Sequence, residues 1–68
     1  METIDILLKM YSEMLETSIK EAKVSAAKFK AVNYEWAVGY YEGRAAGYEW
    51  ALYLIKALID QRERDAKK

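Results

Sequence analysis

The 68-residue sequence contains no cysteine, no histidine and no proline. Without cysteine or histidine, the chain has no disulfide, no zinc-finger ligand set, no thiol nucleophile and no imidazole base. Its 11 basic residues balance its 11 acidic residues, and a formal net charge of zero argues against a general binder of nucleic acid or anionic membranes. These absences predict a protein that is not an enzyme and that uses no cofactor and no metal.

The chain also lacks a recognisable targeting or membrane segment. Glu2 and Asp5 stand where a secretory signal would have basic residues. The most apolar window, residues 50–59, contains Lys56 and is about half of the ~20 residues needed to cross a bilayer. We therefore expect a soluble, cytoplasmic protein that does not enter membranes.

A chain of this length forms one domain, and we expect a single helical-hairpin domain over residues 1–68. Domains this small bury only about 60% of the surface that their unfolded chain exposes. With no disulfide or metal to add stability, self-association is the expected source of further burial.

The first half of the sequence has the pattern of an amphipathic helix. The absence of proline and the abundance of alanine, leucine, glutamate and lysine favour helix. Apolar and small side chains recur on one stripe, roughly 140° wide at 100° per residue. The stripe comprises Ile4, Leu7, Leu8, Tyr11, Met14, Leu15, Ser18, Ile19, Ala22, Ser25, Ala26, Phe29 and Val32. This spacing predicts a helix over about residues 3–32.

The second half repeats with a period of seven, which is typical of helices packed along their length. The repeat produces two seams. We call one the tyrosine seam, which comprises Tyr34, Val38, Tyr41, Ala45, Tyr48, Leu52, Ile55 and Ile59. We call the other the glycine seam, which comprises Trp36, Tyr40, Gly43, Gly47, Trp50 and Leu54. The apolar arc spans about 200°, whereas one neighbouring helix covers about 100°. We therefore expect a helix over residues 34–64, a frayed tail at 65–68, and an interface with a second copy along the glycine seam. The alternative is that the glycine seam binds a foreign partner.

The distribution of charge places a turn near Asn33, a residue type that favours helix N-caps. Residues 1–16 carry four acidic residues and one lysine, and residues 17–33 carry four lysines and one glutamate. Residues 34–55 carry three glutamates and one arginine, and residues 56–68 carry five basic and three acidic residues. An antiparallel fold at Asn33 sets acidic blocks beside basic ones. A single long helix in an extended coiled coil is the competing alternative.

Three glycines, Gly39, Gly43 and Gly47, follow one another at a spacing of four. Each costs about 1 kcal/mol of helix stability relative to alanine, so their presence requires a packing reason. Folding at the predicted turn sets them roughly level with small residues of the first helix, among them Ala22 and Ala26. The pattern predicts close approach of the two helices near the turn and larger side chains toward the open end.

Arg44 lies between the two seams, with Tyr40, Tyr41 and Tyr48 as helical neighbours. A guanidinium beside hydroxyls and aromatic faces fits the phosphate or carboxylate of a small anionic ligand. We therefore take Arg44, Tyr40, Tyr41 and Tyr48 as a candidate ligand site. The alternative is a structural arginine that stacks on Tyr48 or pairs with Glu21 of the facing helix.

The other polar and aromatic clusters predict no chemistry. Consecutive members of the series Glu35, Glu42 and Glu49 are about 10 Å apart along a helix, too far to share a metal ion, and are expected to form a solvated strip. Most of the tyrosines and tryptophans lie between residues 34 and 50, a segment that is acidic. Base-stacking surfaces accompany a basic groove, so these rings are expected to form core and interface.

Together these patterns predict an all-α fold, an antiparallel hairpin of two long helices that assembles into a homodimeric four-helix bundle or a higher oligomer. In length and layout the chain is similar to small RNA-binding hairpins of plasmid regulators, a similarity of architecture that implies no residue roles. In style it resembles the small inhibitors and adaptors encoded by phages and mobile elements. We expect a non-enzymatic module that binds itself and another protein. The alternatives are a small-molecule or nucleotide binder with Arg44 at an oligomer interface, and an RNA-binding bundle.

Overall fold

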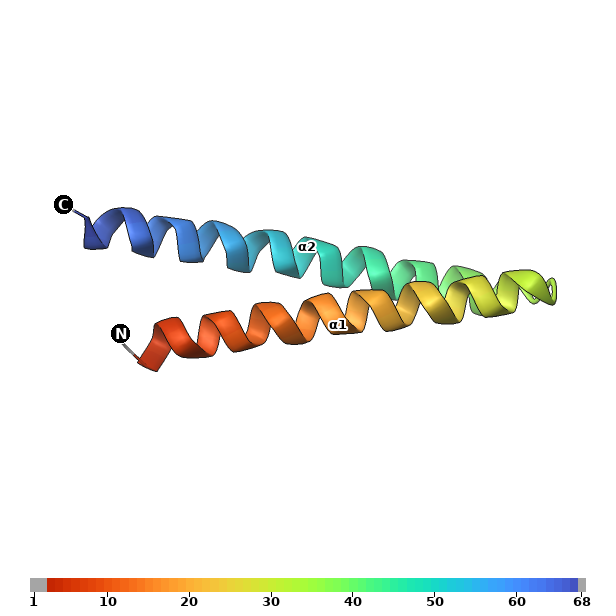
Figure 1. Cartoon of the computed structure of the whole chain (residues 1–68). Helices are drawn as coiled ribbons and strands as arrows, with labels where there is room; N and C mark the ends of the chain where they lie inside the picture. The colour runs from red at the N-terminus through yellow and green to blue at the C-terminus, as the bar shows by residue number, and fades with distance from the viewer. Residues whose placement is uncertain (1–2, 68) are drawn as a thin grey trace.

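The computed structural model describes residues 3–67, which form two antiparallel helices joined by a short turn (Figure 1). Helix α1 spans Thr3–Ala31 and helix α2 spans Glu35–Ala66. The predicted all-α hairpin is therefore confirmed, and the alternative of one continuous helix is wrong. α2 continues two residues beyond its predicted end at 64, and residue 68 of the predicted tail lies outside the described residues. Neither helix, over residues 3–67, has a segment long and apolar enough to cross a membrane.

The turn is closed by Asn33, whose backbone adopts the left-handed conformation with φ of 59°. The N–H of Asn33 donates to the carbonyl of Lys30 at 3.1 Å, and the N–H of Tyr34 donates to the carbonyl of Phe29 at 3.0 Å. These two bonds form the Schellman pattern of a helix C-terminus. The rings of Phe29 and Tyr34 lie 5.8 Å apart, which supplies the apolar contact that accompanies the pattern.

Asn33 therefore ends α1, and the prediction that it caps the second helix is wrong. Tyr34 occupies the N-cap position of α2 and makes no side-chain capping hydrogen bond. Asparagine suits both roles, because its short polar side chain favours N-caps and also tolerates the left-handed region. The position of the turn was predicted correctly, although Asn33 ends α1 and does not begin α2.

Three ion pairs cross between the helices and join blocks of opposite charge, as the sequence predicts. They connect Lys23 to Glu49 at 2.9 Å, Lys56 to Glu16 at 3.3 Å, and Arg62 to Asp5 at 2.6 Å. All six side chains are a third or more exposed, so each pair contributes at most about 1 kcal/mol. Their main effect is to favour the antiparallel register over alternatives that place like charges together.

The contact between the helices is built mainly from alanines, with leucines toward the open end. Ala22, Ala26, Ala37 and Ala45 are buried, as are the larger Leu8 and Leu15 of α1. Figure 1 shows the helices close together near the turn and separating toward the termini. Because interaxial distance follows the size of the side chains at the contact, the small residues explain the taper.

The glycines take no part in this contact, which corrects the prediction that they let the two helices of the hairpin approach closely. A Cβ atom added at Gly39, Gly43 or Gly47 would meet no atom within 4 Å. All three residues are exposed, because the tyrosine seam faces α1 and the glycine seam lies elsewhere on α2. The expected small-against-small packing near the turn is present, but alanines provide it.

The apolar stripe of α1 is only partly covered by α2. Ile4, Leu7, Tyr11 and Met14 remain between 45% and 62% exposed, and Val32 is 70% exposed. One helix cannot cover an arc of this width, so part of the stripe faces away from α2.

The hairpin is elongated and has a small core for its length. It measures 53 × 15 × 12 Å, with a radius of gyration of 15.6 Å, whereas a compact domain of this length has a radius of about 11 Å. Its accessible surface is 5537 Å², whereas a folded monomer of 7.9 kDa exposes about 4,400 Å². No large side chain among residues 3–67 is fully buried.

Candidate functional site

The glycine seam is an exposed strip along α2 in which aromatic pairs flank two glycines. Trp36 is 71% exposed and Trp50 is 65% exposed. The rings of Trp36 and Tyr40 stack at 5.6 Å, and those of Trp50 and Tyr53 stack at 5.7 Å. Between the two pairs, the glycines of the seam leave open space. The strip therefore has bulky rings on both sides of a centre that carries no side chains.

All six residues predicted to form an interface are exposed in the hairpin. They are Trp36, Tyr40, Gly43, Gly47, Trp50 and Leu54. Exposed apolar surface on this scale is typical of an interaction site, and tryptophan and tyrosine are the residue types enriched at interface hot spots. Neither property distinguishes a second copy from a foreign protein as the partner. The choice between these partners therefore depends on the shape of the strip.

Arg44 is held in place by two tyrosines of its own helix. Its Nη1 donates a hydrogen bond to Tyr40 Oη at 2.9 Å, and its Nη2 donates to Tyr48 Oη at 2.6 Å. The guanidinium carbon lies 5.6 Å from the centroid of each ring, within the range of cation–π attraction. These hydrogen bonds raise the pKa of Arg44 above its ordinary value, so the side chain stays cationic at every physiological pH.

Of the two structural contacts that the sequence suggested for Arg44, the structure contains one. The contact with Tyr48 is present, but the ion pair with Glu21 is not. Within residues 3–67, no carboxylate oxygen lies within 4.0 Å of the guanidinium. Arg44 therefore differs from Lys23 and Lys56, each of which meets a carboxylate of the other helix.

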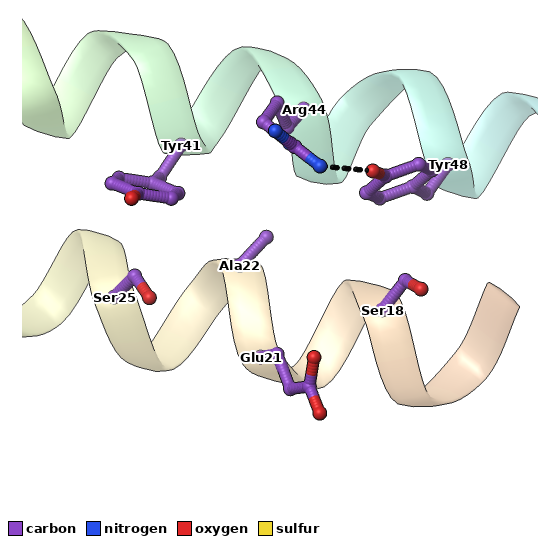
Figure 2. A pocket seen from close by; sticks show the side chains of 7 residues that line it. All are labelled: Ser18, Glu21, Ala22, Ser25, Tyr41, Arg44 and Tyr48. Atoms are coloured by element: carbon purple, nitrogen blue, oxygen red, sulfur yellow. Dashed lines mark hydrogen bonds between the residues drawn. The ribbon is translucent and has the colours of Figure 1, made fainter. Parts of the chain in front are cut away.

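A cavity of about 200 Å³ opens between the helices beside Arg44 (Figure 2). It is lined by Arg44, Tyr41 and Tyr48 of α2, and by Ser18, Glu21, Ala22 and Ser25 of α1. In Figure 2, Ala22 points toward α2 below Arg44, whereas Glu21 points away from α2. The space exists because alanine fills so little of the gap opposite the arginine.

Four of the seven cavity residues, all on α1, were not predicted as site residues, and the two with hydroxyl groups matter most. Ser18 and Ser25 are half-buried, and neither side chain makes a hydrogen bond within the part of the chain that the structure describes. In the sequence, the two serines are identified only as small members of the apolar stripe. The available signal was their position on either side of Ala22, which the predicted fold sets close to Arg44.

The four predicted ligand residues have different surroundings in the structure. Tyr40, Arg44 and Tyr48 are brought together by hydrogen bonds. Tyr41 lines the cavity, and its ring stacks on that of Phe29 at 5.6 Å. The arrangement offers hydrogen-bond donors and aromatic walls but no nucleophile–base pair.

Glu35, Glu42 and Glu49 are all exposed, as predicted for a solvated strip, although Glu49 also pairs with Lys23 of α1 at 2.9 Å. Over residues 3–67, no three acidic side chains gather into a metal-binding cluster. Comparisons with known protein families, with curated proteins and with solved structures find no match for this chain. Its function is therefore inferred from its own residues and geometry.

Proposed function

We propose that the protein is a non-enzymatic interaction module that works as a self-associated helical bundle, with the glycine seam of one copy docked on the same seam of a second copy. The observation that carries the proposal is the uncovered apolar surface of α2. Over both helices together, including the exposed part of the α1 stripe, the hairpin exposes about 1,100 Å² more than a folded monomer of its mass. This excess is similar to the ~800 Å² that each partner covers in an interface of standard size.

A second copy fits the seam because the seam is symmetric in side-chain size about Ala45. Moving outward from Ala45 in both directions, the seam has Gly43 and Gly47, then Tyr40 and Trp50, then Trp36 and Leu54. A copy laid antiparallel over the same centre therefore matches glycine with glycine and large residues with large residues. Self-complementarity of this kind is what a two-fold symmetric contact requires.

The antiparallel pairing also explains why α2 contains glycines, which the packing within the hairpin does not explain. Gly43 of one copy faces Gly47 of the other, so the two α2 helices approach closely at the centre. Gly39 comes nearly level with Tyr53 of the second copy, whose ring enters the open space at that glycine. The helix stability that the glycines cost, about 1 kcal/mol each, is offset by this contact.

An inhibitor or adaptor role follows for the assembled form, because such proteins act by occupying a partner's surface and need no reactive groups. An RNA-binding bundle has less support. The three cations that bind across the hairpin, Lys23, Lys56 and Arg62, are each paired with a carboxylate. They therefore do not combine into the basic groove that nucleic-acid binding requires.

Sedimentation at tens of micromolar tests self-association. We expect a species of about 16 kDa or more, since the chain itself has a mass of 7.9 kDa. Trp50→Glu should weaken assembly by roughly 30-fold, because it removes an aromatic anchor and places a charge in the contact. Val24→Glu is the matched control, since Val24 is exposed but lies outside the seam. A monomeric wild-type protein, or equal weakening by both variants, would contradict the proposal.

Single cysteines test the antiparallel register, because the chain has none of its own. In this register, residue 46 of the two copies lies within about 3 Å along the helix axis, whereas residue 53 lies about 24 Å from its equivalent. We expect Ala46→Cys to cross-link with itself. Tyr53→Cys should not, but it should cross-link with Gly39→Cys in a mixture. Self-cross-linking at all three positions would indicate parallel pairing, and no cross-linking of an intact dimer would place the contact on another face.

A further inference from the structure

We propose that Arg44, Ser18 and Ser25 form a binding site for a small oxyanion, a phosphate or carboxylate group, in the cavity between α1 and α2. The site lies within one copy of the chain. It therefore goes beyond the proposed self-association and does not depend on it.

The first argument is that the guanidinium of Arg44, which is exposed, borders the cavity and meets no carboxylate within residues 3–67. The other cations that reach across the hairpin find a carboxylate, as Lys23 does with Glu49 at 2.9 Å. Arg44 contacts only the hydroxyls of Tyr40 and Tyr48, which are neutral acceptors. These contacts occupy two of the five guanidinium N–H groups. They hold the side chain in one position and leave three donors for a ligand.

The second argument is the pair of serine hydroxyls on the opposite wall. Ser18 lies below Tyr48 and Ser25 lies below Tyr41 in Figure 2, with Ala22 between them below Arg44. Both serines are half-buried, and within residues 3–67 neither hydroxyl has a hydrogen-bond partner. Each hydroxyl stays accessible to solvent, so it can donate a hydrogen bond to a ligand in the cavity.

The chemistry of the lining selects an anion with oxygen acceptors. Arg44, Ser18 and Ser25 all donate hydrogen bonds, and a guanidinium binds phosphate or carboxylate through two parallel bonds. The one acidic group at the cavity, Glu21, points away from α2. A volume of about 200 Å³ is smaller than the ~300 Å³ at which drug-sized pockets begin. The site therefore suits an oxyanion with a small organic part and not a whole nucleotide.

The test is a titration with inorganic phosphate, and separately with acetate, at constant ionic strength, followed by amide chemical shifts. We expect saturable shifts centred on residues 18–25 and 41–48 for at least one anion. Arg44→Gln should weaken binding at least tenfold, and the double variant Ser18→Ala/Ser25→Ala about fivefold. Lys23→Gln is the control, since Lys23 is already paired with Glu49, and it should leave the affinity unchanged.

The serine variant keeps the test decisive if Arg44→Gln fails to fold, because alanine is well tolerated in helices. Binding that is weaker in the folded serine variant supports the site. Unchanged binding in that variant overturns it. Shifts that never saturate, or that Lys23→Gln reduces as much as Arg44→Gln, would show diffuse attraction to surface charge and would also overturn it.

Discussion

Replacing Gly43 and Gly47 together by leucine should make the protein monomeric while making α2 a stronger helix. In the single hairpin both positions are open, with no atom within 4 Å of an added Cβ. The substitutions therefore cost no packing there and remove a helix penalty of about 1 kcal/mol at each position. In the antiparallel pair the same positions form the centre of the contact, where leucine side chains would force the helices apart.

The two effects have opposite signs and are measured in the same samples. Sedimentation should show loss of assembly by at least ~100-fold in the dissociation constant, equivalent to about 2.7 kcal/mol. Circular dichroism should show helix content that is unchanged or higher. Ala27→Leu is the control, because Ala27 is exposed on α1. A leucine variant that assembles as strongly as the wild-type protein would remove the glycine seam from the interface.

Leu15→Ala should lower the free energy of unfolding by about 3 kcal/mol, within the range for buried leucines. Leu15 is 8% exposed and Leu8 is 9% exposed, and these are the only large side chains in the buried core of residues 3–67. A core this small supplies only about 3–5 kcal/mol. The substitution should therefore remove most of the stability of the hairpin.

Urea or thermal unfolding at one fixed protein concentration measures this loss. Ile6→Ala serves as the control, since Ile6 is 46% exposed and its truncation should cost less than about 1 kcal/mol. If Leu15→Ala also cost less than that, the hairpin contact would contribute little. Stability would then reside in the contact between copies.

The helices and the turn were predictable because each depends on a pattern that the sequence displays directly. These patterns are a stripe of period 3.6, a repeat of seven and alternating charge blocks. Each is a sum over many residues, so one atypical residue does not change the prediction. These patterns do not show which helix packs against each seam. The glycine spacing indicates close approach to some helix, but spacing alone does not say which one, and the prediction wrongly chose the helix within the hairpin.

The candidate site was predictable on one side only. Tyr40, Arg44 and Tyr48 lie four residues apart on one helix, so their contacts follow from helical geometry. The composition and shape of the opposite wall of the cavity depend on which residues of α1 lie level with Arg44 and on how much space Ala22 leaves. Serine also gives no distinct signal in an apolar stripe, where it counts as a small residue and not as a hydrogen-bond donor.

If both proposals hold, the position of Arg44, one residue from Ala45, would couple ion binding to assembly. The side-chain sizes of the glycine seam are symmetric about the axial level of Ala45, so the proposed antiparallel pair would bring the two Arg44 residues nearly level with each other beside the contact, where their charges would repel. An oxyanion at each site removes part of that repulsion. By thermodynamic linkage, the factor by which the anion strengthens pairing equals the factor by which pairing strengthens anion binding. The oligomeric state would then respond to the concentration of a small phosphorylated or carboxylated compound, and a simple pair of helices would act as a sensor.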